Sequence, residues 1–398
     1  MSTTAAAGFV AGGLASGIKP SGAPDLAIVA TASGAPVIAA GVFTTNLVTA
    51  APVQVSRAHL VNSRAAAVVC NSGNANAATG EPGRRDARRM CELTAAGLGI
   101  ADLADVLVCS TGLIGIPMPM DALESGIPKL CAGLSSDGGT AAAEAIMTTD
   151  TVTKQAVEQA GVSGATVTIG GMAKGAAMLS PAMATMLAVI TTDAAVEPGV
   201  LTRSLAGAVR STFDCLIVDG SRSTNDTVLV LASGAAGNET LREARGPAFD
   251  AFTDALGTVC GSLAEMMARD AEGATKFVRV EVVGARSDAD ARTAARAVAG
   301  SQLVQCSLNG ADPYWGRIIS ELGASGAYLD PERVDISYND VTVCRDGVAC
   351  AHDVAALAAA MAEHDITIHC DLRLAHGRAT VLTTDLSHEY IDENRRTS

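Results

Sequence analysis

Residues 171–194 read GMAKGAAMLSPAMATMLAVITTDA, and the interpretation of the whole chain depends on this stretch. An apolar run begins at Met186 and predicts a buried strand over Met186–Ile190. Two glycines, Lys174 and Pro181 interrupt the approach to this run, and Thr185 stands directly before it. The ordinary interpretation of Thr185 is a β-branched residue at the start of a buried strand. The alternative is that Thr185 is a nucleophile.

The composition predicts a folded protein with more than one compact core. The chain has 398 residues, which exceeds the usual size of a single core, so we expect two domains or one domain with two sizeable halves. Hydrophobic residues make up 48% of the sequence and charged residues 18%, a balance that is typical of globular rather than disordered chains. Because aromatic residues contribute only 3%, the cores are expected to be packed from aliphatic side chains and Met.

The charge pattern argues against nucleic acid and membrane partners. The formal net charge is -14, whereas binding to phosphates needs clustered Lys and Arg. The basic run Arg84–Arg89 is better explained as a solvated helix face. No apolar run reaches the roughly 18 residues that a membrane helix requires. No basic residue precedes Lys19, so the charged region of a secretory signal is missing, and we predict a cytoplasmic protein.

The cysteines and histidines do not form a metal-binding pattern. Ten cysteines occur, none of them in a C-x-x-C pair, and most lie in apolar stretches. This usage is typical of free, buried thiols in a reducing compartment. His364, His369 and Cys370 lie close in the sequence, but no second ligand pair accompanies them. We therefore predict no metal site.

Short apolar runs alternate with amphipathic segments along the chain. Strands are expected at Ala66–Cys70, Val106–Cys109, Ala165–Ile169, Met186–Ile190, Thr227–Leu231 and Val278–Val282, and helices at Arg84–Leu98, Thr140–Met147, Leu201–Phe213, Phe249–Met267 and Asp288–Ala299. The last quarter predicts two hairpins, Val334–Tyr338 with Val341–Cys344 and Ile366–Leu374 with Ala379–Thr383. The alternation favours an α/β or α+β fold with mixed sheets.

Three polar segments follow short apolar runs and are predicted to be loops that carry a site: Asn71–Gly80, Ser110–Gly112 and Ser221–Asp226. A Ser-Thr-Gly loop can present consecutive backbone N–H groups, as an oxyanion hole requires, although an ordinary turn is the simpler explanation of Ser110–Gly112. The phosphate-binding P-loop, the G-x-G-x-x-G fingerprint and the G-x-S-x-G elbow are all missing from the sequence. A nucleotide site and an α/β-hydrolase site therefore have no support.

Several blocks together carry a resemblance to a known family. Lys174–Leu179 and Pro181–Leu187 resemble the signature of the ornithine acetyltransferases, also called bifunctional arginine-biosynthesis glutamate N-acetyltransferases. Further blocks match in the family's order over almost the whole chain: Gly41–Asn46 with Ala50–Val53, Asn71–Asn76, Cys109–Gly115, Ala145–Thr151, Ser223–Thr227, Asp270–Lys276, Asp312–Pro313 with Trp315–Arg317, and Thr384–Ser387. Agreement over so many blocks is not expected by chance.

The resemblance implies a fold and a maturation step. The fold would be the two-lobed α/β sandwich of the ornithine acetyltransferase type, with mixed sheets and an N-terminal threonine nucleophile. Members of the family cut themselves before the threonine, so the bond between Ala184 and Thr185 would break. The products would be an α chain, 1–184, and a β chain, 185–398, which assemble as an α2β2 unit.

The resemblance also implies the chemistry. The freed Thr185 amine would act as the base for the Thr185 hydroxyl, which takes acetyl from N-acetylornithine and passes it to glutamate. Thr111 and Gly112 would stabilise the oxyanion. Substrate binding carries over to Thr149, Lys174, Thr185, Glu272, Asn394 and Ser398. No bound cofactor is implied, and acetyl-CoA as a second acetyl donor stays open.

Three alternatives remain at the level of sequence. The family has other residues where Tyr314 and Gln305 stand, which motivates a paralogue of specialised metabolism that uses the same nucleophile on another amino acid or acyl donor. A second alternative is an amide hydrolase with the same nucleophile, and a third is a non-catalytic scaffold that does not cleave.

Overall fold

The computed structural model describes residues 2–178 and 186–395, which divide into two compact units. The first unit comprises Met1–Asp214 and Ser221–Met267, and the second comprises Cys215–Gly220 and Ala268–Ser398. The expectation of two sizeable halves is thus confirmed. The boundary between the units differs from the predicted cleavage position, which falls inside the range of the first unit.

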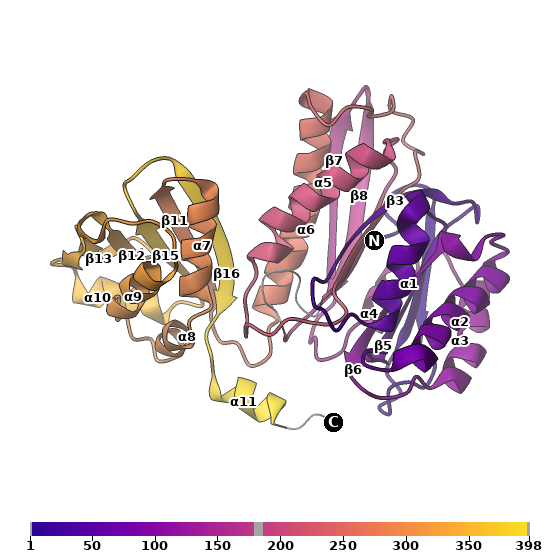
Figure 1. The fold of residues 1–398 in the computed structure, drawn as a ribbon, viewed down its shortest axis with the longest axis horizontal. Coiled ribbons are helices and arrows are strands. Elements are labelled where there is room, and N and C mark those ends of the chain that lie inside the picture. The colour runs from indigo at the N-terminus through magenta and orange to yellow at the C-terminus, as the bar shows by residue number, and fades with distance from the viewer. Residues whose placement is uncertain (1, 179–185, 396–398) are drawn as a thin grey trace. The chain divides into compact units, whose positions relative to one another are not determined.

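Three mixed sheets form in the part of the chain that the structure describes (Figure 1). The first has the order β1 (Phe9–Leu14), β2 (Leu26–Thr31), β5 (Ala67–Asn74), β6 (Val106–Leu113). The second has the order β4 (Arg64–Ala65), β3 (Val37–Phe43), β10 (Thr227–Ala232), β9 (Leu187–Thr192), β8 (Ala165–Lys174), β7 (Lys154–Val162). The third has the order β14 (Val348–Ala349), β13 (Val341–Arg345), β12 (Asp335–Tyr338), β15 (Asp365–Asp371), β11 (Phe277–Ala285), β16 (Gly377–Thr384).

The helices of the described residues also divide between the two units. The first unit contains α1 (Ala51–His59), α2 (Gly80–Leu98), α3 (Met120–Ala132), α4 (Gly139–Ala145), α5 (Pro198–Ser211) and nearly all of α6 (Pro247–Arg269). The second contains α7 (Asp288–Ala299), α8 (Gln302–Asn309), α9 (Gly316–Ala324), α10 (Val354–Ala362) and α11 (His388–Asn394). None of these helices is long and apolar enough to cross a membrane.

The first unit is a sandwich of two sheets, with residues of α4 in the core between them and other helices outside. Inward-facing residues of both sheets share one core, which includes Val29 of β2, Leu107 of β6 and Leu229 of β10. The alternate residues of the first sheet, such as Ile28 and Val108, face a second core formed with α1, α2 and α3. Helices α5 and α6 lie along the second sheet (Figure 1).

Burial on both faces explains why these strands are continuous apolar runs rather than alternating ones. Residues Leu187–Thr192 of β9 and Thr227–Ala232 of β10 are buried throughout. The two strands pair in parallel, with Leu187 opposite Thr227. Central strands that are covered on both sides have this pattern. The predicted strand over Met186–Ile190 is confirmed, and it begins one residue later than expected.

The second unit has one sheet with a single buried face. Val278, Val280 and Val282 of β11 enter its core, whereas Arg279 and Glu281 between them are half-buried on the other face. The alternation in the sequence predicted this arrangement correctly. The hairpin of β12 and β13 is likewise confirmed by their antiparallel pairing.

The second predicted hairpin is wrong. Strand β11 lies between β15 and β16, paired in parallel with β15 and antiparallel with β16. The connection after β15 crosses the end of β11, where the N–H groups of Leu374 and Ala375 donate to the carbonyl oxygen of Gly284. A turn signal shows that the chain reverses, but it does not show whether another strand enters between the two arms.

We expect Leu229→Ala to destabilise the protein strongly, because Leu229 is fully buried between the two sheets of the first unit. The free energy of unfolding should fall by about 2–5 kcal/mol, as for other large-to-small changes in cores. Urea denaturation measures this change. Leu47→Ala is the matched control, because Leu47 is 100% exposed and its truncation should change stability by no more than about 0.5 kcal/mol. Equal effects of the two substitutions would contradict the packing described above.

Candidate active site

The parallel strands β5 and β6 end in polar, buried residues. Ser72 lies opposite Thr111 and Gly73 lies opposite Gly112 in the ladder. Residues 71–74 and 110–112 were expected to be loops, but the strands continue through them. The prediction was wrong because the backbone hydrogen bonds that pair two strands do not depend on whether the side chains are polar.

Thr111 has the features of an oxyanion-stabilising residue. Its side chain is 1% exposed, and its Oγ1 has no hydrogen-bond partner among the described residues. Most buried hydroxyl groups do have a partner, so an unmatched one at a strand end is a sign of a binding function. The hydroxyl is therefore suited to donate a hydrogen bond to a substrate oxygen.

Gly112 is required by the backbone. Its φ angle is +131°, a conformation that residues with side chains rarely adopt. A Cβ atom added at Gly112 would lie 2.3 Å from the carbonyl carbon of Gly73 on the neighbouring strand. The close approach of the two strand ends therefore depends on glycine at this position.

Lys174 lies at the end of β8 in a buried cluster of charges. Its Nζ donates to Thr148 Oγ1 at 2.6 Å and lies 3.7 Å from Asp150 Oδ2. Asp150 Oδ1 accepts hydrogen bonds from Lys154 Nζ and from the Gly175 N–H, each at 2.7 Å. Asp150 thus joins the loop after α4 to the segment that precedes the predicted cleavage position.

The two lysines stabilise the charged form of Asp150. Burial by itself would raise the pKa of this carboxyl, but Lys174 and Lys154 outweigh burial and hold the pKa well below its usual value. Lys154 is completely buried and Lys174 is 2% exposed. One buried carboxylate therefore stands beside two buried ammonium groups.

Lys19 is a residue that the sequence analysis did not connect with the site. Its Nζ donates to the carbonyl oxygens of Met147 and Pro24, both at 2.7 Å. Burial lowers its pKa, and the neighbouring Lys174 lowers it further. No local motif marks Lys19, because the partner that connects it with the loop after α4, Met147, lies 128 residues away along the chain.

The segment Ser223–Thr227 joins the two sheets of the first unit. Asn225 Nδ2 donates to the carbonyl oxygens of Ser110 at 2.8 Å and Ala75 at 2.6 Å. Asp226 Oδ1 accepts the N–H of Met186 at 3.0 Å. Burial raises the pKa of Asp226 well above its usual value. Ser221–Asp226 was predicted to be a polar loop and Ser223–Thr227 matches a family block, but no residue of either range was predicted to have a specific role.

Glu272 and Asn394 meet in the second unit. Glu272 Oε2 accepts a hydrogen bond from Asn394 Nδ2 at 2.7 Å, and Asn394 also donates to the Tyr390 carbonyl oxygen. Two predicted substrate-binding residues that are 122 positions apart are thus neighbours. Their proximity agrees with a common site but does not by itself test their function.

Of the remaining predicted site residues, the structure describes Thr149. Thr149 is exposed, on the loop between Thr148 and Asp150. Ala184, Thr185 and Ser398 lie outside the described residues, so the predicted cleavage position and nucleophile remain sequence predictions.

Gln305 and Tyr314, which motivated the alternative of a paralogue in specialised metabolism, differ in their surroundings. Gln305 is 3% exposed, and its Nε2 donates to the Val218 carbonyl oxygen and to Thr383 Oγ1. These contacts give Gln305 a structural explanation within the second unit. Tyr314 is 58% exposed, and its ring packs beside Gly316.

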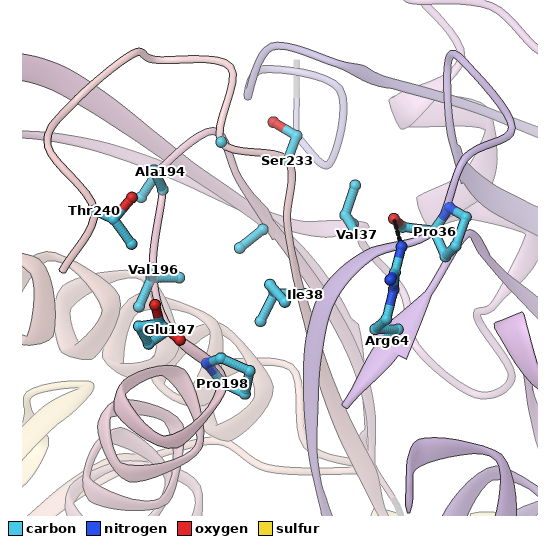
Figure 2. Close-up of a pocket in the computed structure, with 13 residues that line it drawn as sticks. Pro36, Val37, Ile38, Arg64, Ala194, Val196, Glu197, Pro198, Ser233 and Thr240 are labelled. Atoms are coloured by element: carbon cyan, nitrogen blue, oxygen red, sulfur yellow. Dashed lines mark hydrogen bonds between the residues drawn. The ribbon is translucent and has the colours of Figure 1, made fainter. Parts of the chain in front are cut away.

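A pocket of about 430 Å³ lies near the C-terminal ends of β9 and β10 (Figure 2). Met186 and Asp226 precede the other ends of these two strands. The pocket is bordered by residues such as Ile38, Val196, Glu197 and Ser233, and the Arg64 guanidinium at its edge donates to the Pro36 carbonyl oxygen. None of the predicted site residues lines this pocket, so it is not the candidate active site.

The thiols are free, and most of them are buried, as predicted. The exceptions are Cys306, which is exposed, and Cys350, which is partly exposed. Within residues 2–178 and 186–395, no group of three or more His, Cys, Asp or Glu side chains is arranged to hold a metal ion.

Asp150→Asn should lower the free energy of unfolding by about 3–5 kcal/mol, because it removes the carboxylate beside two buried ammonium groups. The control is Glu243→Gln, which breaks an exposed pair with Arg245 and should cost about 0–1 kcal/mol.

The stability lost in Asp150→Asn should also depend on pH. Because the pKa of Asp150 is lowered in the folded state, its contribution is complete above the unfolded value of about 3.9 and declines as the pH falls below it. Urea denaturation of both proteins between about pH 3 and pH 7 measures the difference. A difference that grows towards low pH would contradict this assignment.

Comparison with known proteins identifies the family. Residues 10–397 match the ArgJ family. The arginine biosynthesis bifunctional protein ArgJ of Symbiobacterium thermophilum is 49% identical over 98% of this chain and 97% of its own length. The protein of the same name from Streptomyces coelicolor is 45% identical over 99% of both chains.

A solved structure extends the comparison. The crystal structure of the arginine biosynthesis bifunctional protein ArgJ from Bacillus halodurans matches with a TM-score of 0.50 and 36% identity, and the match covers 52% of this chain and 96% of the solved chain. With relatives this similar over nearly the full length, the chain belongs to the ArgJ family.

Proposed function

We propose that this protein is a glutamate N-acetyltransferase of arginine biosynthesis, which moves acetyl from N-acetylornithine to glutamate through an acetyl-Thr185 intermediate. The observation that carries the proposal is the identity of 45–49% to curated arginine biosynthesis relatives over 98–99% of this chain. The strand ends with Thr111 and Gly112 and the cation cluster at Lys174 are groups that acetyl transfer to an amino acid needs.

The first step is self-cleavage. The Thr185 hydroxyl attacks the Ala184 carbonyl carbon, the bond from that carbon to the Thr185 nitrogen breaks, and an ester forms. Water hydrolyses the ester, which leaves a carboxylate at Ala184 and a free amine and hydroxyl at Thr185. The amine has a reference pKa of about 7.7–8.0 and is a suitable base for its own hydroxyl.

Acetyl transfer follows in two half-reactions. The Thr185 hydroxyl gives its proton to the amine and attacks the acetyl carbonyl carbon of N-acetylornithine. The tetrahedral intermediate collapses, the ornithine nitrogen takes the proton and leaves, and Thr185 carries the acetyl group. The amine of glutamate then attacks this ester, so that N-acetylglutamate is released and the hydroxyl is restored. No bound cofactor takes part in this scheme.

The site residues take distinct roles in this proposal. The Thr111 hydroxyl and the Gly112 N–H stabilise the oxyanion of both tetrahedral intermediates. Lys174, with Thr149 on the adjoining loop, binds a substrate carboxylate through its ammonium group. Glu272 and Asn394, which are hydrogen-bonded to each other, bind the substrate's amino and polar groups, together with Ser398.

Cleavage would leave both fragments in one sheet. Strand β8 before the predicted bond and β9 after it are antiparallel neighbours, with Lys174 opposite Leu187. The two chains would therefore stay associated through backbone hydrogen bonds, and we propose that they assemble as α2β2. The solved relative supports a division near the middle, since 96% of that chain corresponds to 52% of this one.

Two further aspects belong to the proposal. The curated relatives are named for arginine biosynthesis, and Gln305 is engaged in buried structural contacts, so a paralogue of specialised metabolism is not favoured. We also propose that the enzyme acts in the cytoplasm, because ten cysteines without a disulfide suit a reducing compartment.

Intact mass under denaturing conditions tests the nucleophile. The wild-type protein should give two fragments, one ending at Ala184 and one beginning at Thr185, and Thr185→Ala should give a single full-length chain. Full-length chain in both samples would rule out the proposed mechanism and would favour the non-catalytic alternative.

The role of Thr111 is tested by the isosteric change Thr111→Val. Loss of the hydroxyl should lower kcat for acetyl transfer by about 100- to 1,000-fold with little change in KM, since the hydrogen bond forms mainly in the transition state. Thr111→Ser keeps the hydroxyl and should retain most of the activity. Steady-state kinetics with N-acetylornithine and glutamate measure both variants, and equal activity of Thr111→Val and wild type would exclude this role.

A further inference from the structure

We propose that Asn225 and Asp226 form a clamp that positions the nucleophile against the oxyanion-stabilising groups. Asp226 holds Met186, the residue that follows Thr185, and Asn225 holds Ser110, the residue that precedes Thr111. Both are positioning residues, since neither is assigned a contact with substrate. The inference rests on the proposed function and extends it to two residues that this function leaves without a role.

Asp226 fixes the peptide group that adjoins the nucleophile. Its Oδ1 accepts the Met186 N–H at 3.0 Å, and the N–H of Thr227 donates to the Met186 carbonyl oxygen at 3.2 Å. The Met186 nitrogen belongs to the planar peptide group whose carbonyl is that of Thr185. A hydrogen bond to this N–H therefore restrains the residue that directly follows the proposed nucleophile.

Asn225 fixes the strand end that carries Thr111. Its two amide hydrogens are donated to the carbonyl oxygens of Ala75 and Ser110, and its Oδ1 accepts the Thr224 hydroxyl at 2.6 Å. An amide supplies two donors and an acceptor in one group, which is the set that these partners require. The side chain is 4% exposed, so loss of any of these bonds would leave a buried polar group unmatched.

The clamp spans the sandwich because its two neighbouring side chains bind different sheets. Asn225 binds residues of β6 and the end of β5 in the first sheet, and Asp226 binds the residue before β9 in the second sheet. The backbone directly after Asp226 is anchored to Thr44, which follows β3 and whose N–H donates to the Asp226 carbonyl oxygen. A single short segment thus sets the spacing between the two strand ends that the chemistry needs.

The Asp226 side chain accepts a hydrogen bond, whereas the Asn225 amide donates two, so substitutions between aspartate and asparagine test the proposal. Asp226 acts as an acceptor toward Met186, and an asparagine at this position would also present an acceptor oxygen. Asn225 acts as a donor toward two carbonyl oxygens, and an aspartate carboxylate would present only acceptors to them.

The experiment compares Asn225→Asp, which replaces an amide nitrogen by a carboxyl oxygen, with Asp226→Asn, which makes the reverse replacement. We expect Asp226→Asn to keep the rate of self-cleavage and the kcat of acetyl transfer within about fivefold of wild type, since its acceptor remains. Asn225→Asp should lower both by about 100-fold, because small displacements of reacting groups have effects of this size. Asp226→Ala, which removes the acceptor, should resemble Asn225→Asp.

Hydrogen–deuterium exchange separates a failure of the clamp from a failure of the proposed function, because it needs no activity. In the full-length Thr185→Ala background, Asp226→Ala should increase exchange at Met186 at least about tenfold, whereas Asp226→Asn should not. If wild type does not cleave but this pattern is found, the function fails and the clamp stands. Unchanged exchange and activity in all three variants would overturn the clamp. Equal loss in Asp226→Asn and Asp226→Ala would also overturn it, because the proton and not the acceptor would then matter.

Discussion

The face-to-face packing of two sheets is the constraint on which the rest of the first unit depends. Inward-facing residues of both sheets form one core, and the outer face of the first sheet is covered by α1, α2 and α3. Helices α5 and α6 lie along the second sheet (Figure 1), and its central strands β9 and β10 are buried over their whole length. Burial of this kind favours apolar residues along the whole strand and makes any polar residue at a strand end costly unless it is bonded.

The polar groups of the candidate site occur where this constraint is met by specific partners. Asn225 uses both donors and its acceptor, and Asp150 is surrounded by ammonium and N–H donors. Thr111 is the contrast, because its hydroxyl is buried without a partner among the described residues. The adjacent Ser110 hydroxyl is also buried without a partner among the described residues, and two such neighbouring hydroxyls at one strand end are more typical of a binding site than of a packing defect.

The organisation of the site also explains how a chain can be divided without losing its fold. Strands β8 and β9 flank the predicted cleavage bond and are neighbours in one sheet. Their ladder and the shared core act between the two fragments as they do within one chain. The boundaries of the compact units fall at other positions along the chain, so the predicted cleavage position does not coincide with a domain boundary.

The predicted strands and helices and the family followed from the sequence alone, because apolar periodicity and local motifs are properties of short stretches, whereas β1, β2, β3, β7, α1 and α3 were not predicted. Only the tertiary structure decided which distant segments lie side by side and which residues are hydrogen-bonded to each other. Asn225 meets Ala75 across 150 positions and Ser110 across 115, and β11 enters between β15 and β16, where the turn signals predicted a hairpin. The continuation of β5 and β6 through polar residues has the same cause. Pairing and burial depend on which distant segment lies alongside, and a short stretch of sequence does not specify that neighbour.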